Sequence, residues 1–192
     1  MISKKQKILI ISGFAVVVIG VSALLIARKK RNKNVDSTKN YIIGDSQTPF
    51  FDKNSTKVSR ISEQSGKSSL WEGGQNLKWL KSAVEEYPVS PDVNSITINI
   101  GTNGGFSPND DVNGLVSAIK QKFPNAKLYV VQGSWGWGGN KNITEEKVKA
   151  YYDRFSALGV KVISPAIGSV ADPHGNLPIY ATIGKELDKV IS

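Results

Sequence analysis

The chain has 192 residues, with 25 Lys and Arg against 16 Asp and Glu, no Cys and one His. This length accommodates one domain of ordinary size together with an appendage. The absence of Cys excludes a disulfide framework, a thiolate zinc site and a Cys nucleophile. A single His excludes a metal site built from several histidines.

The net charge of +9 is unevenly distributed along the chain. Residues 1–34 contain eight basic residues and no acidic residue, whereas residues 35–192 contain 17 basic and 16 acidic residues. The basic character therefore belongs to the N-terminus, and the rest of the chain is close to neutral. This distribution argues against a nucleic-acid-binding domain, and we expect no nucleic acid among the partners.

Residues 8–27 form an apolar segment of 20 residues without a charge. As a helix this segment is about 30 Å long, which matches the hydrocarbon core of a bilayer. The apolar stretch of a cleaved signal peptide, the alternative reading, is shorter, about 7–15 residues. We expect residues 1–34 to be a single-pass membrane anchor with basic flanks, followed by a linker at 35–40 and a domain at 41–192. The basic counts of the two flanks are too similar to orient the domain.

The sequence after the linker alternates strand and helix patterns. Short segments rich in β-branched residues predict strands at 41–44, 57–61, 95–100, 128–132 and 160–164. Apolar residues recurring every three or four positions predict helices over 77–87, 112–123, 148–158 and 179–190. This alternation predicts a three-layer α/β/α domain with a five-stranded parallel sheet, preceded by one transmembrane helix.

Small and polar residues follow the predicted strands. Ser46 comes directly after the first strand, and Gly66 lies after the second. Asn103 follows the third strand, and Asp172 and His174 lie in the loop after the fifth. Because ligands of parallel α/β sheets bind beyond the carboxyl ends of the strands, we expect these residues to converge at one edge of the sheet.

These residue types can form a site for nucleophilic acyl transfer. A serine hydroxyl needs a base that takes its proton, and the charge that develops on the attacked carbonyl oxygen needs hydrogen-bond donors. Ser46 and His174 can act as nucleophile and base, and Asp172 can orient His174. The backbone N–H of Gly66 and the side-chain amide of Asn103 can act as the donors. The set matches the roles of a Ser-His-Asp site.

The order GDS, Ser-Gly, G-x-N and Asp/His resembles the SGNH (GDSL-type) serine hydrolase family over about residues 40–192. The resemblance implies a flavodoxin-like fold and ester hydrolysis without a metal or organic cofactor. It implies that Ser46 is the nucleophile, and that its own N–H, Gly66 and Asn103 form the oxyanion hole. It also implies that His174 is the general base and Asp172 its partner.

Two features depart from the pattern of that family. The family usually has Asp three residues before the His, whereas Asp172 lies two residues before His174. In addition, the Ser-Gly motif matches the family only loosely, so Gly73 and Gly74 are alternatives to Gly66 as the oxyanion donor.

The loop after the fourth strand contains Trp135 and Trp137 among glycines. Aromatic faces at this edge suit stacking against a sugar ring or packing of an acyl chain, and we predict that both tryptophans contact the substrate. In the alternative interpretation, one of them plugs the space over the sheet.

Together these patterns favour a membrane-anchored acyl or acetyl esterase that acts on a cell-envelope glycan or on a lipid ester. A lysophospholipase whose substrate comes from the anchoring membrane is a narrower form of the same hypothesis. The Asp172–His174 spacing keeps a second class open: a catalytically inactive SGNH-like binding or structural membrane protein, in an envelope or in a membrane-containing virus particle.

Overall fold

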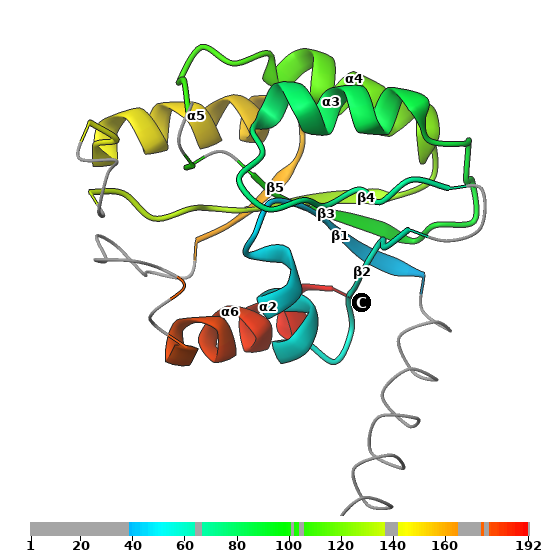
Figure 1. Ribbon diagram of the computed structural model, residues 1–192, viewed down its shortest axis with the longest axis horizontal. Coiled ribbons are helices and arrows are strands. Elements are labelled where there is room, and N and C mark those ends of the chain that lie inside the picture. Colours follow the sequence, from blue (N-terminus) through cyan, green and yellow to red (C-terminus); the bar gives the residue numbers. More distant parts are fainter. Residues whose placement is uncertain are drawn as a thin grey trace, which may run out of the picture.

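The computed structural model describes residues 39–63, 67–100, 102–103, 106–136, 142–164, 174 and 177–191. A parallel five-stranded sheet lies at the centre of the domain (Figure 1). Its order is β2-β1-β3-β4-β5, with β1 (Asn40–Gly44), β2 (Ser59–Arg60), β3 (Ser95–Asn99), β4 (Lys127–Val131) and β5 (Lys161–Ile163). The predicted parallel sheet is confirmed, and the predicted strand boundaries lie within two residues of the observed ones.

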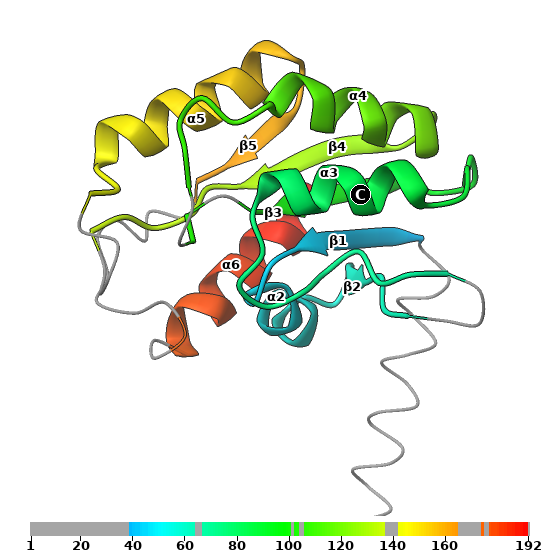
Figure 2. The ribbon, with the colours of Figure 1, turned by 45° about the horizontal axis from the view of Figure 1, so that its top comes forward.

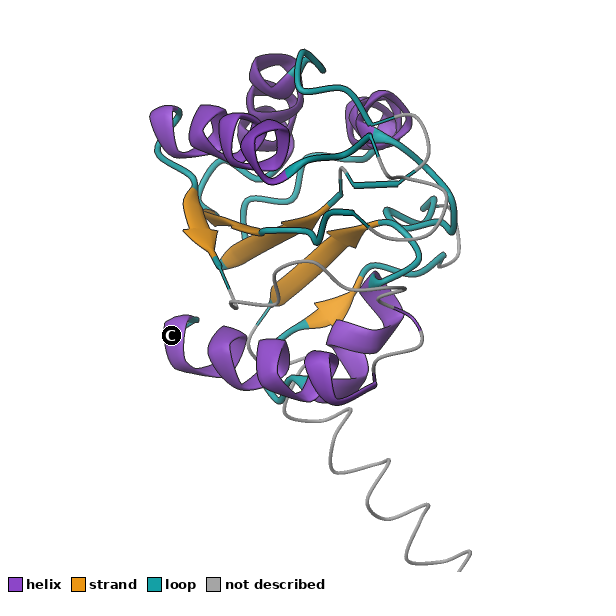
Figure 3. Ribbon diagram, turned by 90° about the vertical axis from the view of Figure 1, so that its left-hand side faces the viewer, coloured by secondary structure: helices purple, strands orange, loops and turns teal. Residues whose placement is uncertain are grey.

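Helices cover both faces of the sheet (Figure 3). One face carries α3 (Leu77–Glu86), α4 (Val112–Lys122) and α5 (Glu145–Ala157), and the other carries α2 (Thr48–Asn54) and α6 (Leu177–Val190), as the labels of Figure 1 show. The predicted three-layer α/β/α architecture is therefore confirmed for the described part of the chain.

The strands contribute side chains to two hydrophobic clusters, one on each face of the sheet, because neighbouring side chains of a strand point to opposite faces. In β1, Ile43 packs in the cluster beneath α3, α4 and α5, whereas Ile42 packs in the cluster beneath α2 and α6. In β4, Val130 and Val131 divide in the same way, and all four side chains are fully buried. Burial on both faces explains why these strands read as continuous apolar runs in the sequence.

The boundaries of α5 follow from local chemistry. The side chain of Thr144 accepts a hydrogen bond from the backbone N–H of Lys147, which satisfies one donor of the first turn. Glu145 and Glu146 lie in that turn, where the helix dipole favours acidic residues. After the helix, Gly159 adopts a φ of 78°, which suits glycine just beyond a helix end.

Helix α2 was not predicted from the sequence. It has seven residues, begins with a proline in its first turn, and buries only Thr48 and Phe51. A helix of this length has too few apolar positions for a recognisable period. Its stability comes instead from packing against α6, where Phe51 meets the ring of Tyr180 at 5.3 Å between ring centroids.

Because all five strands are parallel, the sheet has a carboxyl edge, where the strands end, and an amino edge, where they begin (Figure 2). β1 starts at Asn40, so the chain enters the domain at the amino edge. Within the described residues, no helix is both long and apolar enough to cross a membrane. The predicted membrane segment at residues 8–27 lies outside the described residues, so it stays a prediction.

Candidate active site

Ser46 and His174 meet at the carboxyl edge of the sheet. Ser46 lies in the turn between β1 and α2, and its Oγ is 2.8 Å from Nε2 of His174. The imidazole also packs edge-on against Phe50, with 5.8 Å between ring centroids. A hydroxyl and a ring nitrogen at this distance are within the reach needed for proton transfer. The structure thus brings together the predicted nucleophile and the predicted base, which are 128 residues apart in the chain.

Gly44 gives the turn before Ser46 its shape. Its φ of 146° is a backbone conformation that residues with a side chain rarely adopt. A Cβ at this position would lie 1.7 Å from the carbonyl oxygen of Asn99. The N–H of Gly44 donates to the carbonyl of Leu70, and its own carbonyl accepts from the N–H of Glu72. The turn is therefore held between the end of β3 and the segment 70–72. Any residue larger than glycine at position 44 would clash with β3.

A buried acidic residue stands between Gly44 and Ser46. Asp45 is 2% exposed, and its Oδ1 accepts hydrogen bonds from the N–H of Gln47 at 2.9 Å and from Nδ2 of Asn99 at 3.2 Å. Burial raises the pKa of Asp45 to about 7, against the lowering influence of these hydrogen bonds and of His174. A group that titrates near neutrality beside a nucleophile is typical of functional sites.

The segment 73–75 connects Ser46 with Asn103. A Cβ on Gly73 would lie 3.8 Å from Cβ of Ser46, so the backbone of Gly73 runs past the serine. Asn103 is held close to the same segment, because its Nδ2 donates to the carbonyl oxygen of Gln75 at 2.6 Å. An amide nitrogen carries two hydrogens, so Asn103 retains a second N–H for an oxyanion.

The remaining predicted site residues divide into two groups. Gly66, Asp172 and Trp137 lie outside the described residues, and their roles stay predictions. Trp135 is described: it is half-buried and packs against the cluster beneath α3, α4 and α5. This position shows the contact with the core that the alternative interpretation expects, and the contact of Trp135 with a substrate stays a prediction.

The ends of β3 and β4 are tied to α5 by one buried hydroxyl. The OH of Tyr152 accepts a hydrogen bond from the N–H of Gly133 at 2.9 Å and donates to the carbonyl of Ile100 at 3.3 Å. Burial raises the pKa of Tyr152 well above its usual range, which keeps the hydroxyl neutral and able to donate. The hydroxyl of Tyr152 therefore fixes the positions at which the loops after β3 and β4 begin.

Asn99, like Asp45, is a residue of the site that the sequence patterns did not single out. It is 4% exposed at the end of β3, a strand in which every residue is buried. A polar side chain that ends such a strand needs a buried partner, and here the partner is Asp45. In the sequence, the indication was an asparagine at the end of the otherwise apolar or small-residue strand Ser95–Asn99.

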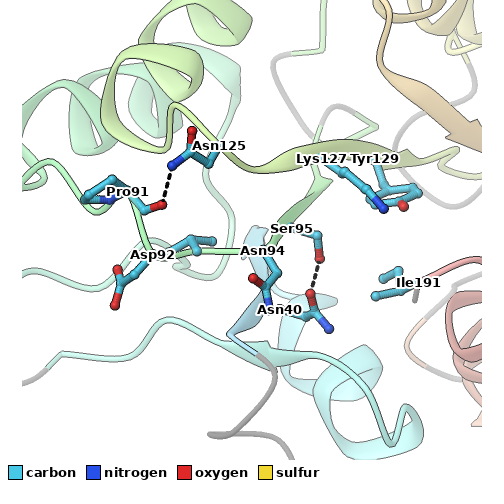
Figure 4. Close-up of a pocket in the computed structure, with 10 residues that line it drawn as sticks. Asn40, Pro91, Asp92, Asn94, Ser95, Asn125, Lys127, Tyr129 and Ile191 are labelled. Carbon is cyan, nitrogen blue, oxygen red and sulfur yellow. Dashed lines mark hydrogen bonds between the residues drawn. The ribbon is translucent and has the colours of Figure 1, made fainter.

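A hollow of about 420 Å³ lies at the opposite edge, around the starts of β1, β3 and β4 (Figure 4). Its lining includes Asn40 and Ser95, which hydrogen-bond each other at 2.8 Å, and Asn125, which donates to the carbonyl of Pro91. These polar groups are occupied in joining strand starts and loops, so we do not assign the reaction to this hollow.

Among the described residues, no group of three or more His, Asp or Glu gathers to hold a metal ion.

Comparison with known proteins identifies the fold. No protein-family model matches the sequence, and no curated protein matches it. Among solved structures, the chain is similar to a member of the lipolytic protein G-D-S-L family from Veillonella parvula, at 16% identity and a TM-score of 0.52. That match covers 78% of this chain and 96% of the other.

A second similar structure is a GDSL-like lipase from Bacteroides thetaiotaomicron, at 15% identity and a TM-score of 0.53. This match covers 81% of this chain and 90% of the other. The domain therefore has the fold of the SGNH (GDSL-type) lipolytic proteins. At such low identity the likeness extends to the fold alone, and the activity depends on the site.

Proposed function

We propose that the protein is an SGNH-type serine ester hydrolase that residues 8–27 hold at a membrane. The observation that carries the proposed activity is the 2.8 Å contact between Oγ of Ser46 and Nε2 of His174, at the edge of the sheet where this fold places its ligands. The buried turn around Gly44, the second donor of Asn103 and the backbone of Gly73 support it.

The geometry supports a two-step acyl transfer. Oγ of Ser46 attacks the ester carbonyl carbon while Nε2 of His174 takes the hydroxyl proton. The oxyanion then accepts hydrogen bonds from the N–H of Ser46, from Asn103 and from a glycine N–H. His174 returns the proton to the departing alcohol oxygen. Water activated by His174 next attacks the acyl-enzyme, which releases the acid and restores Ser46.

Gly73 and Gly66 are both candidates for the glycine donor. Gly73 is the one that the structure describes beside Ser46, with 3.8 Å between Cβ of Ser46 and the position a Cβ would take on Gly73. The competing assignment of Gly73 from the sequence thus gains support. Gly74 has a φ of 77° and nothing within 4 Å of its own Cβ position, so nothing places it against the serine.

Two observations favour a water-exposed envelope ester, such as an acetylated glycan, over a bilayer lipid as the substrate. β1 begins at the amino edge and Ser46 follows its end, so an anchor before β1 would enter the domain on the side opposite the serine, with a strand of about 17 Å between them. A groove of about 470 Å³ is also lined by Glu72, the neighbour of Gly73 in the chain, and by Glu63, Glu86 and Trp79. A lining of carboxylates, serines and a tryptophan suits a sugar better than an acyl chain.

The activity is tested by labelling the full chain in detergent micelles with a fluorophosphonate, followed by peptide mapping. Wild type should be labelled on Ser46, and both Ser46→Ala and His174→Ala should lose the label while keeping the circular dichroism spectrum of wild type. Absence of label on folded wild type would contradict the proposal and would favour a non-catalytic binding protein.

The substrate preference is tested separately with two esters on the same sample. We expect faster hydrolysis of a soluble acetylated sugar than of a micellar lysophospholipid. The reverse order would overturn the preference for a water-exposed ester while leaving the serine hydrolase proposal intact.

A further inference from the structure

Two neighbouring hollows lie at the amino edge of the sheet, away from Ser46. One is the hollow of about 420 Å³ in Figure 4. The other, of about 180 Å³, lies beside the starts of β1 and β2. Asp92 and Val93 line both hollows, so the two adjoin at the loop before β3. The proposed reaction at the carboxyl edge uses neither of them.

Four basic side chains line these two hollows. Lys39, Arg60 and Lys67 line the smaller one, and Lys127 lines the larger one. Among the residues that the structure describes, Asp92 is the only acidic residue in either lining. We call Lys39, Arg60, Lys67 and Lys127 the basic surface.

Aromatic rings hold two cations of the basic surface in place. The guanidinium of Arg60 lies 4.9 Å from the centroid of the Trp71 ring, and Nζ of Lys67 lies 5.9 Å from the centroid of the Tyr87 ring. A cation over an aromatic face keeps its charge and its other N–H donors. Both side chains can therefore still receive an anion.

Two carboxylates balance part of the charge. Lys39 pairs with Asp92, and Nη1 of Arg60 lies 3.7 Å from an Asp52 oxygen. These pairs are partly exposed to water, where an ion pair contributes little and an anionic ligand can compete for the cation. Since the basic surface has four cations against these two carboxylates, it keeps a net positive charge.

The opposite sign prevails in the groove of about 470 Å³ beside α3. Its lining includes Glu63, Glu72 and Glu86, and the part of the lining that the structure describes has no basic residue. Residues 35–192 are close to neutral as a whole, so charge is separated between the two surfaces. An anionic surface therefore attracts the amino edge and repels this groove.

The sequence brings an anionic surface close to the amino edge. Lys39 directly precedes β1, and the predicted membrane segment ends at residue 27. The intervening chain spans at most about 40 Å when fully extended. Residues 28–33 include five further basic residues, which anionic headgroups attract. A tether of this length gives an effective concentration of roughly millimolar, at which weak contacts are populated.

We propose that the basic surface docks the domain on the headgroups of anionic phospholipids in the membrane that holds the chain. The 180 Å³ hollow, lined by Lys39, Arg60 and Lys67, suits a headgroup phosphate. Docking through the amino edge leaves Ser46 on the side away from the bilayer, where a water-exposed ester arrives. The proposal rests on the proposed anchor and not on the proposed reaction.

The orientation is measured with the full chain in vesicles. Because the chain has no Cys, one fluorophore can be attached through Asn125→Cys at the amino edge or through Asn113→Cys at the other end of α4, both exposed positions. The vesicles contain phosphatidylcholine alone, or equal parts of phosphatidylcholine and phosphatidylglycerol. Each preparation also contains a lipid with a nitroxide quencher on its headgroup.

We expect the fluorophore at Asn125→Cys to be quenched about twofold or more strongly in vesicles with phosphatidylglycerol than in phosphatidylcholine alone. The excess should disappear in about 1 M salt, where charges are screened beyond about 3 Å. The fluorophore at Asn113→Cys should be quenched weakly and equally in both. Equal quenching at Asn125→Cys in the two compositions, or stronger quenching at Asn113→Cys, would overturn the proposal.

Charge removal identifies the residues. In the Asn125→Cys chain, the combination Lys39→Gln, Arg60→Gln and Lys67→Gln should abolish the excess quenching, because each basic side chain strengthens binding to an anionic surface about fivefold. If this combination loses the circular dichroism spectrum of wild type, Lys67→Gln with Lys127→Gln replaces it, since both side chains are exposed. An excess that persists in the folded variant would contradict the proposal.

The matched control removes the same charge elsewhere. Lys78→Gln, Lys147→Gln and Lys149→Gln change exposed lysines near the first turns of α3 and α5, at the carboxyl edge. This variant should keep the excess quenching in full. A loss equal to that of the amino-edge variant would show that net charge alone acts, and the assignment to the basic surface would fail.

Washing the same vesicles with alkaline carbonate tests the anchor separately. A chain that the wash removes would contradict the anchor of the proposed function, and the comparison of the two lipid compositions would still decide whether the basic surface binds anionic lipid. Labelling of Ser46 is involved in neither measurement, so the proposed hydrolase activity stands or falls independently.

Discussion

The two edges of the sheet both bury polar side chains, but in different energetic states. At the amino edge, Ser95 and Asn40 are almost fully buried, and the Ser95 hydroxyl donates to the Asn40 amide oxygen at 2.8 Å. At the carboxyl edge, Asp45 is equally buried, but its carboxyl must ionise against the cost of burial. A neutral hydrogen-bonded pair joins two strands at little cost, whereas a buried acid whose pKa is raised is a cost that folding alone does not require.

The two edges also differ in their backbone. The carboxyl edge contains Gly44, whose φ of 146° and close approach to the Asn99 carbonyl leave no room for a side chain. The described starts of β1, β3 and β4 contain no glycine of this kind. We therefore interpret the amino edge as a surface built for stability and the carboxyl edge as one built to hold Ser46 in place, and three substitutions test this difference.

The largest effect is expected at the carboxyl edge for Gly44→Ala. The new Cβ would lie 1.7 Å from the Asn99 carbonyl oxygen, so the backbone of β1 or β3 must move. We expect a loss of about 4 kcal/mol or more in the free energy of unfolding, together with loss of Ser46 labelling. Denaturant unfolding of the full chain in micelles measures the first effect.

The matched control is Gly159→Ala. Gly159 also has a positive φ, 78°, but nothing lies within 4 Å of its Cβ position. The strain of a left-handed residue alone should cost about 1–2 kcal/mol. Equal costs for the two variants would show that the close approach at Gly44 is unimportant.

The second prediction concerns the pH dependence of stability in Asp45→Asn. In wild type the pKa of Asp45 is raised from 3.8 to about 7, which corresponds to about 4 kcal/mol. Below about pH 3 the carboxyl is protonated in both the folded and the unfolded chain, so no charge is buried on folding. As the pH rises towards 7, the unfolded chain ionises first and wild type loses stability.

Asp45→Asn should therefore be more stable than wild type at pH 8, by up to about 4 kcal/mol, and the gain should disappear below about pH 3. Thermal unfolding at the two pH values measures this difference. A variant that is less stable than wild type at pH 8 would indicate that the carboxylate serves the fold, and the contrast between the two edges would then fail at this residue.

The smallest effect is expected at the amino edge for Ser95→Ala. Removal of the hydroxyl leaves the buried amide oxygen of Asn40 without this donor, which should cost about 1–2 kcal/mol. The labelling rate of Ser46 should not change, because the two positions lie at opposite edges. Ser90→Ala, whose hydroxyl donates to the Pro88 carbonyl at 3.3 Å in an exposed hydrogen bond, is the control and should be nearly neutral. A drop in labelling for folded Ser95→Ala would show that the edges are coupled.

Much of the architecture was predictable because it depends on local patterns. The apolar β-branched runs marked all five strands, and the three- and four-residue periods marked α3, α4, α5 and α6. The convergence of Ser46 and His174 at one edge also followed, because every strand of a parallel sheet ends on the same side. Helix α2 was missed because seven residues carry too short a pattern.

Other features of the site depend on pairings between distant segments. The register of Gly44 opposite Asn99 places an amide beside Asp45, and the path of segment 70–75 brings Gly73 past Ser46. Neither pairing has a local signature, since periodicity reports which face of an element is buried and not which residue it meets.

The sequence by itself determined the α/β class, the strand positions and the residue types available for ester chemistry, because these follow from hydrophobic period, strand propensity and side-chain chemistry. The tertiary structure alone decided the 2.8 Å contact of Ser46 with His174, the neighbourhood of Gly73 and the burial of Asp45. Distances and desolvation arise when segments far apart in the chain pack together, and a raised pKa such as that of Asp45 exists only once that packing has excluded water.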